Sequence, residues 1–373
     1  MKRKPMYLYV AEELKKQIYN GDFPVDQPLP TQIEFANIFK TSEITSRRAL
    51  TELVNEGLIY RVRGKGSFVK INKAEEHTNS ESEVEIKRIY FVYPNCSLNL
   101  LAHPFYQELL DGINEGCEDK DVEFVTWNIG KQGKLPDDKN AGFIVLAQGQ
   151  GSEEISLKML EGWKNENKRL VSVHFYYPHL KIPYVIINNV TGGYLATQHL
   201  ISQGHEKIGL ILTGRSLIEL NQEFSLRMQG YKLALSQHQL PFNPSYVAIA
   251  EGMQETEEMG YECMKKLLDL DDPPTAVVAT SDYKAFGAIQ AALDYGFKVP
   301  EDISVIGFDD IPFGKYSSPP LTTINQNSLK LGKRAVELLV DEYDKSDKED
   351  ILKDEIAPDL IVRGSTSKPL KRI

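Results

Sequence analysis

Charged residues near the start of the chain have the types and spacing needed to contact DNA. Glu43 and Arg47 are four residues apart, so a helix would present them on one face. Glu43 could accept a hydrogen bond from a cytosine amino group, or it could pair with Arg47. Arg63 and Lys65 stand among glycines, which allow the backbone to approach a ligand closely. These residues therefore suit contacts to a duplex.

The elements that must position these residues form a helix-turn-helix. Thr31 and Glu34 have the spacing of a capping box, which predicts the start of a helix. Ser42 can cap a second helix, which Gly57 would end. An amphipathic helix over 5–20 would pack beneath this pair.

Two strands, 58–63 and 67–70, follow the second helix and would form a hairpin with the basic tip at its turn. A helix that fits a major groove, beside a hairpin that fits a minor groove, indicates a DNA-binding domain. A small helical domain with a solvated charged face is the alternative. The residues expected to contact DNA are Lys4, Thr31, Glu43, Thr45, Ser46, Arg47, Arg63, Gly64, Lys65 and Gly66.

This stretch resembles the winged helix of the GntR family of regulators over about 7–69. The family pattern is Leu-Pro-Ser-Glu-Arg, then Val-Ser-Arg-x-Thr-Val-Arg, then Gly-x-Gly-Thr-Phe-Val. The matching segments here begin at Leu29, Thr41 and Gly64. Ile33 and Glu43 replace two arginines of the pattern, so the operator sequence does not follow from the resemblance.

The charge is divided unevenly along the 373 residues. The segment 1–73 has 13 Lys and Arg against 8 Asp and Glu, a net charge of +5, whereas the whole chain carries −10. The remainder therefore carries −15. A basic head on an acidic body is typical of a tethered DNA-binding domain, whose attraction to phosphate does not depend on base sequence.

Composition and motifs exclude several other classes of protein. Cys96, Cys117 and Cys263 are far apart, which indicates a reducing compartment and neither a zinc site nor a disulfide framework. No apolar run is long enough to span a membrane, and the N-terminus is unlike a secretory signal, so we expect a cytoplasmic protein. The sequence has no Gly-rich phosphate loop, GxSxG or HExxH motif. We therefore expect no enzyme activity, no cofactor and no metal.

A polar segment separates a domain over 1–71 from a second domain over 87–367. Residues 72–86 contain almost no large apolar side chain, which is typical of a linker. Beyond it, apolar strands alternate with helices, which predicts an α/β body of parallel sheets covered on both faces, behind the small α+β head. Helices are expected over 193–202, 226–237 and 283–294, and a charged loop over 344–355.

The strands of the body, about ten in number, are too many for one compact sheet. The pattern divides near Asn188 into two doubly wound lobes, about 87–188 and 189–311, with a C-terminal segment, 312–367, crossing between them. Such lobes leave a cleft where the carboxyl ends of their strands face each other, and ligands bind in such clefts.

The body resembles the effector domain of the LacI family over about 87–367. The matching segments are 192–200, 204–208, 227–231, 274–282, 299–310, 321–324 and 360–365. The resemblance implies a periplasmic-binding-protein fold, dimerisation through this domain and a small effector, commonly a sugar. A GntR head joined to a LacI-type body resembles the AraR-like repressors of arabinose use.

The resemblance also implies that Arg227 lies in the cleft, where its donor fork suits sugar hydroxyls. Asp309 follows a strand and could accept two hydroxyl bonds, and the alternative is a loop cap by Asp310. Asp282 could face the ligand or cap the helix that begins at Tyr283.

Aromatic and polar residues complete the expected effector site. Phe105 and Tyr106 match the family's aromatic pair, although they could equally pack at the start of a helix. His174 is more typical of a histidine satisfied by its surroundings than of a ligand-binding residue. Further candidates at strand or loop positions are Asn188, Asn221 and Glu223.

We interpret the chain as a transcriptional regulator, most simply a repressor of a carbohydrate-utilisation operon. The partners expected are double-stranded operator DNA, a small sugar effector (a pentose such as arabinose is favoured) and a second copy in a homodimer, with no membrane. A solute-binding protein, or a sugar-modifying enzyme with a DNA-binding head, is the alternative.

Overall fold

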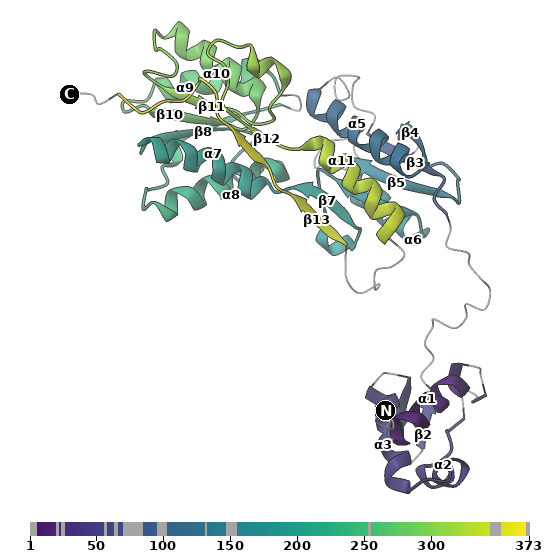
Figure 1. Ribbon diagram of the computed structural model, residues 1–373. Coiled ribbons are helices and arrows are strands. Elements are labelled where there is room, and N and C mark those ends of the chain that lie inside the picture. Colours follow the sequence, from purple (N-terminus) through teal and green to yellow (C-terminus); the bar gives the residue numbers. More distant parts are fainter. Residues whose placement is uncertain are drawn as a thin grey trace. The chain divides into compact units, whose positions relative to one another are not determined.

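The computed structural model describes the chain in segments, which fall into two compact units. The described residues are 6–19, 22–23, 27–55, 58–62, 66–69, 85–94, 103–130, 133–146, 155–252, 255–343 and 352–370. One unit, Met1–Glu83, is the head, and the other, Val84–Ile373, is the body (Figure 1). Of the helices in these segments, none is long and apolar enough to cross a membrane.

The described part of the head contains three helices and a hairpin. The elements are α1 (Met6–Tyr19), α2 (Gln32–Ile38), α3 (Glu43–Asn55), β1 (Ile59–Val62) and β2 (Gly66–Val69). β1 and β2 pair antiparallel, as the sequence predicts. Side chains spaced one turn apart on the helices form a single core, which includes Val10, Leu14, Phe35, Leu50, Leu53 and Ile59.

Lobe 1 of the body is a six-stranded parallel sheet in the order β13-β7-β6-β5-β3-β4. The strands are β3 (Arg88–Tyr93), β4 (Glu123–Asn128), β5 (Ala141–Leu146), β6 (Arg169–Val173), β7 (Tyr184–Ile187) and β13 (Lys353–Ile356). The helices are α5 (Pro104–Asp119), α6 (Leu157–Asn165) and α11 (Ser328–Glu337). The predicted doubly wound fold is confirmed in this lobe.

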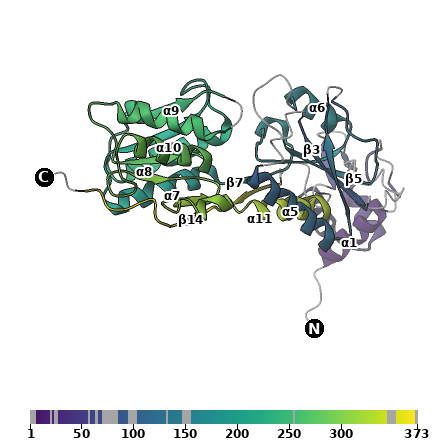
Figure 2. The same cartoon turned by 90° about the horizontal axis from the view of Figure 1, so that it is seen from above.

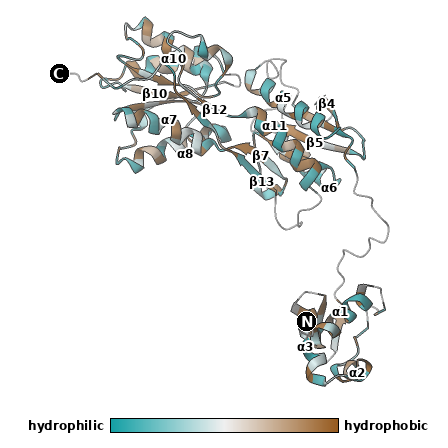
Figure 3. Ribbon diagram, viewed as in Figure 1, coloured by the Kyte–Doolittle hydropathy of each residue, from teal (hydrophilic) through white to brown (hydrophobic). Residues whose placement is uncertain are grey.

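Successive residues of the central strands face opposite layers of lobe 1. Ile89 and Phe91 pack with α5 and α11, whereas Tyr90 and Val92 pack on the other face with Trp163 of α6. The strand β5 is buried along its whole length and is hydrophobic throughout (Figure 3). Burial on both faces explains why these strands are apolar runs rather than alternating patterns.

Lobe 2 has a four-stranded parallel sheet in the order β11-β10-β8-β9. The strands are β8 (Ile208–Thr213), β9 (Val247–Ala250), β10 (Ala276–Ala279) and β11 (Ser304–Ile306). α7 (Asn189–Gln203) and α8 (Gln222–Gln237) cover one face, and α9 (Glu257–Leu268) and α10 (Asp282–Asp294) cover the other. α7 and α8 each begin four residues before the predicted start.

The C-terminal segment crosses between the lobes, as the sequence predicts (Figure 2). β12 (Thr323–Asn325) and β14 (Asp359–Ile361) pair antiparallel, whereas α11 and β13 belong to lobe 1. The expected charged loop over 344–355 is wrong at its end, because Lys353–Ile356 pairs with β7 as an edge strand. Residues 344–351 lie outside the described residues.

The shorter helical turns complete the described elements. They are the 3-10 turns η1 (Pro178–Leu180), η2 (Pro244–Tyr246) and η3 (Pro312–Lys315), and the π-helical turn η4 (Leu338–Glu342) that follows α11.

Glycines let the helices of lobe 2 pack at very short range. A Cβ atom on Gly193 of α7 would lie 2.1 Å from the carbonyl oxygen of Arg227, and one on Gly230 of α8 would lie 2.0 Å from that of Val190. Only glycine permits such an approach of two backbones. The close contact fixes the turn of α8 that carries Arg227.

Candidate effector site and DNA-binding face

The exposed face of α3 carries the charged residues predicted to contact DNA. Arg47 is exposed, and its Nε donates to Gln32 Oε1 of α2 at 2.9 Å. Of the two expectations for Glu43, the pair with Arg47 is not found among the described residues. Glu43 is exposed in the first turn of α3, where its carboxylate is accessible to a ligand.

The structure corrects one predicted DNA contact. Ser46 is fully buried on the core-facing side of α3 and is therefore not available to DNA. Thr45 lies at the helix start, with its Oγ1 2.8 Å from Ser42 Oγ. Thr31 forms the predicted capping box, since its backbone N donates to Glu34 Oε2 at 2.7 Å.

The remaining predicted contacts concern the hairpin and the N-terminus. Gly66 is exposed with φ +114, a conformation that L side chains rarely adopt. The predicted contacts outside the described residues are Lys4, Arg63, Gly64 and Lys65.

In the body, titratable side chains from both lobes meet around Arg227, and we name Arg227, Glu223, Asp309 and His174 the interlobe site. Arg227 and Glu223 are one turn apart on α8, Asp309 follows β11, and His174 follows β6. Arg227 is 3% exposed. These residues therefore come from both lobes, near the carboxyl ends of their strands, as predicted.

Neutral acceptors and an aromatic ring hold the Arg227 guanidinium. Its Nε donates to Asn189 Oδ1 at 2.8 Å, and its Nη1 donates to the carbonyl oxygen of Thr280 at 2.6 Å. Its Cζ lies 3.7 Å from the centre of the Phe308 ring. Asn189 Nδ2 donates in turn to the carbonyl oxygen of Ile187, at the end of β7. These hydrogen bonds therefore connect Arg227, through Asn189, to the end of β7, where the polypeptide passes from lobe 1 to lobe 2.

Glu223 is the buried carboxylate of the interlobe site. Its Oε1 lies 3.9 Å from His174 Nε2, and its Oε2 has no hydrogen-bond partner among the described residues. Burial raises the pKa of Glu223 to about 7, against the opposing effect of Arg227. Glu223 is thus a buried acceptor with an unused oxygen. The prediction placed it in a loop, but it lies in the first turn of α8.

His174 contacts rings rather than hydrogen-bond partners. It packs against Phe105, Tyr106 and Phe175, and none of the described residues forms a hydrogen bond with its ring. Burial, and secondarily Arg227, lower its pKa to about 3. The expectation of a satisfied histidine is therefore not supported, and His174 is a neutral ring in this site at pH 7.

Asp309 completes the site from lobe 2. Gln326 Nε2 donates to its Oδ1, and burial raises the pKa of Asp309 to about 6 while Arg227 opposes the shift. Gln326 is buried, and its Oε1 has no partner among the described residues. Asp309 and His174 have φ +124 and +73, and such backbone conformations of non-glycine residues are concentrated at functional sites. Asp310 does not cap this loop, because it pairs with Arg363.

The helix-capping interpretation of Asp282 is wrong. Ser281, not Asp282, caps α10, since Ser281 Oγ accepts from the backbone N of Lys284. The Asp282 carboxylate is buried, and it accepts from Thr323 Oγ1 at 2.6 Å and from the Ile311 backbone N at 2.8 Å. Each oxygen therefore accepts one hydrogen bond, and the bond from Thr323 ties α10 to the crossing segment. A contact between Asp282 and a ligand stays a prediction.

The other predicted residues divide between packing and the site. Phe105 is buried in the lobe 1 core, whereas Tyr106 is half-buried beside His174. Asn188 caps α7, and its Nδ2 donates to Glu355 Oε2 at 2.8 Å, so its amide is occupied. Asn221 stands at the N-cap of α8 but makes no side-chain capping bond.

Sequence analysis missed a buried ion pair beside the interlobe site. Lys284 Nζ lies 2.5 Å from Glu255 Oε1, donates to Thr213 Oγ1 at 2.8 Å and lies 4.1 Å from the centre of the Phe224 ring. Burial lowers the pKa of Lys284. Burial acts to raise the pKa of Glu255, but Lys284, together with Ser281 and Arg227, lowers it overall. The sequence feature that could have predicted this ion pair is a lysine among the small apolar residues of α10.

The two lobes contact each other next to these residues. The rings of His103, at the start of α5, and Tyr283, on α10, are 5.3 Å apart. Gln222 at the start of α8 forms two hydrogen bonds with the backbone of Tyr176, at 3.1 Å and 3.0 Å. A ligand that changes this contact would change the arrangement of the lobes.

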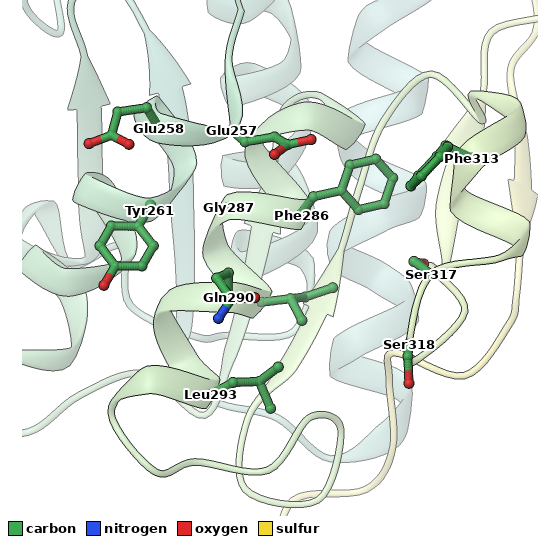
Figure 4. Close-up of a pocket in the computed structure, with 11 residues that line it drawn as sticks. Glu257, Glu258, Tyr261, Phe286, Gly287, Gln290, Leu293, Phe313, Ser317 and Ser318 are labelled. Atoms are coloured by element: carbon green, nitrogen blue, oxygen red, sulfur yellow. The ribbon is translucent and has the colours of Figure 1, made fainter.

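A separate groove lies on the outside of lobe 2 (Figure 4). Its volume is about 380 Å³, and it is formed by α9, α10 and the segment around η3. Phe286 and Phe313 meet edge to face across it, and Phe313 is 71% exposed. None of the predicted effector residues lines this groove.

Two family signatures match the chain. Residues 6–69 match the family of bacterial regulatory proteins named gntR, and residues 197–366 match the periplasmic binding protein-like domain. The predicted resemblances of head and body are therefore confirmed.

Curated relatives are named as repressors. The chain is 32% identical to the HTH-type transcriptional repressor PurR of Mannheimia succiniciproducens, over 71% of this chain and 78% of that one. It is 28% identical to the arabinose metabolism transcriptional repressor of Geobacillus stearothermophilus over 98% of both chains. With PurR of Haemophilus influenzae it shares 43% identity over 182 residues, so the chain spans about half the length of that relative.

The fold is also that of solved regulators. A LacI family transcriptional regulator from Enterococcus faecium with bound ribose is 25% identical, with a TM-score of 0.61 over 76% of this chain and 99% of that one. These relatives are regulators and not enzymes by name. The chain therefore belongs to the family of HTH-type transcriptional repressors with a LacI-type, periplasmic-binding-protein-like effector domain, here joined to a gntR-family head.

Proposed function

We propose that the chain is a repressor of carbohydrate-utilisation genes in the bacterial cytoplasm, without catalytic activity, whose operator affinity is set by a small sugar at the interlobe site. The observation that carries this proposal is the unused, buried Oε2 of Glu223 beside Arg227, in a body joined to a DNA-binding head. The proposed domains are a head over 1–71, a linker over 72–86 and an effector body over 87–367.

The chemistry of the interlobe site favours a neutral, hydroxyl-rich effector. A hydroxyl can donate to Glu223 Oε2 and accept from another group at the same time. Arg227 already uses Nε and Nη1, while Lys284 and Arg363 are paired with carboxylates. A phosphate dianion would need free cations. We therefore propose an unphosphorylated sugar, with a pentose such as arabinose first.

Coupling to DNA is proposed to act through the contact between the lobes. A sugar that binds Glu223 and Arg227 would bias the lobe arrangement through Asn189 and β7. An effector can shift operator affinity only by its differential affinity for the two arrangements, typically about 1–3 kcal/mol. We propose that the chain acts as a homodimer, so that two heads bind two half-sites.

Substitution of Arg227 tests the proposal. Arg227→Ala should bind operator duplex as the natural chain does, but addition of arabinose or another neutral pentose should no longer release the duplex in fluorescence anisotropy. The natural chain should lose about 5- to 150-fold in operator affinity with the effective sugar. Arg88→Ala, at the amino end of β3, is the matched control and should respond fully. Release from Arg227→Ala equal to that from the natural chain would contradict the site assignment.

A further inference from the structure

An isoleucine lies on the exposed face of α3, in the first turn of the helix. Ile44 is 77% exposed. The core-facing residues of the helix are Ser46, Ala49, Leu50 and Leu53. With 3.6 residues per turn, Ile44 points away from the middle of this buried stripe. Its side chain therefore adds nothing to the packing of the head.

Charged residues lie close to Ile44 in the sequence of α3, and two of them contact other helices. Arg47 is fixed by Gln32 of α2, and the Arg48 guanidinium lies 3.9 Å from the centre of the Tyr7 ring of α1. Glu43 precedes Ile44 in the same turn. Two guanidinium groups suit a polyanion, and a carboxylate suits a cytosine amino group. The apolar side chain thus stands within a face that complements a duplex.

We propose that Ile44 packs against the C5-methyl group of a thymine in the major groove and so selects thymine at one position of each half-site. The inference rests on the proposed function, because it requires α3 to enter the groove. Thymine is the base that presents a methyl group there, and apolar contact with that methyl is a common form of direct readout. Sugar and phosphate offer no comparable partner to an isoleucine.

Replacement of thymine by uracil tests this contact, because it removes only the methyl group. A pool of random duplexes is first enriched on the full chain to define the operator. Each thymine of the enriched sequence is then replaced by uracil. We expect one replacement in each half-site to weaken binding by the natural chain about fourfold, the value of one buried methyl-sized group. Ile44→Ala should bind the thymine duplex more weakly by the same factor and should not distinguish it from the uracil duplex.

Ile38→Ala is the matched control, because Ile38 is an exposed isoleucine at the end of α2. It should keep the full preference for thymine. Equal binding of the natural chain to every uracil duplex, or an Ile44→Ala variant that still prefers thymine at the same position, would overturn the inference alone. A full chain that enriches no duplex at low salt would overturn the proposed function together with it.

Discussion

The head and the interlobe site each contain a central arginine, and the two arginines lie in opposite environments. Arg47 is exposed, and Gln32 fixes it through one exposed hydrogen bond. Arg227 is buried, donates to Asn189 and Thr280, and stacks on Phe308. Arg47 keeps much of its hydration until a ligand arrives, whereas Arg227 has lost its hydration during folding.

This difference follows from what each proposed ligand brings. A duplex carries its own dense charge, so the head needs only to hold cations in water near it. A neutral sugar brings hydroxyl groups alone, so the body must fix its charged groups before the ligand binds. Substitutions in the interlobe region should therefore change the folding free energy, and substitutions on the exposed face of α3 should change DNA binding alone.

The largest effect is expected at the buried ion pair. Lys284→Met leaves the Glu255 carboxylate, whose side chain is 21% exposed, without its fully buried cation. Removal of one partner of a buried pair typically lowers the free energy of unfolding by about 3–5 kcal/mol, and the partial exposure of Glu255 places the expected loss at the lower end of this range. Urea unfolding of the full chain, followed by circular dichroism, measures the loss in the body.

The double variant Lys284→Met/Glu255→Gln removes both charges and should recover more than half of this loss, because no unpaired charge then remains. If Lys284→Met lowered the unfolding free energy by less than about 1 kcal/mol, the pair would contribute no more than an exposed ion pair does, and the proposed difference between the body and the head would be wrong.

A smaller, pH-dependent effect is expected at Glu223. Burial raises its pKa from 4.5 to about 7, so the folded chain binds this proton more tightly than the unfolded chain does. Its contribution to stability is therefore complete below about pH 4.5 and is lost as the pH rises through about 7. Glu223→Gln cannot ionise. The unfolding free energy of the natural chain should fall relative to this variant by up to about 3 kcal/mol across that window.

The difference between the two chains is the quantity to measure, by urea unfolding at several pH values. His174 has a lowered pKa and acts in the opposite direction, but it is present in both chains and largely cancels in the difference. A difference that stays constant between pH 4.5 and 7 would show that Glu223 is not held in a buried environment.

Features set by short stretches of sequence were predictable. The Thr31–Glu34 capping box spans four residues and formed as expected. The apolar strands of both lobes followed from burial on both faces. The starts of α7 and α8 were each predicted four residues too late, and in α8 this error placed Glu223 in a loop.

Features that depend on distant segments were not predictable. Glu255 and Lys284 are 29 residues apart and meet only because β9 and β10 lie in the same sheet. β13 is a charged edge strand whose residues alternate between exposed and half-buried, so it carries no hydrophobic signal. The bonds to Asp282 come from Ile311 and Thr323, which lie 29 and 41 residues farther along the chain. The sequence therefore predicted which residues lie near the site, but it did not predict which of their oxygen atoms lack a hydrogen-bond partner.

The smallest effect on folding is expected at Arg47, the exposed arginine of the comparison with Arg227. Arg47→Ala removes only an exposed hydrogen bond to Gln32, so the unfolding free energy of the head should change by no more than about 0.5 kcal/mol. The same variant should bind operator about 1–3 kcal/mol more weakly and with relaxed base preference if Arg47 contacts a base directly, as the sequence predicts. Anisotropy titration and urea unfolding of one preparation give both values. Arg227→Ala should reverse the pattern, with lower stability and intact operator binding. If Arg47→Ala destabilised the head as strongly as it weakened DNA binding, the arginine would belong to the fold and not to the DNA-binding face.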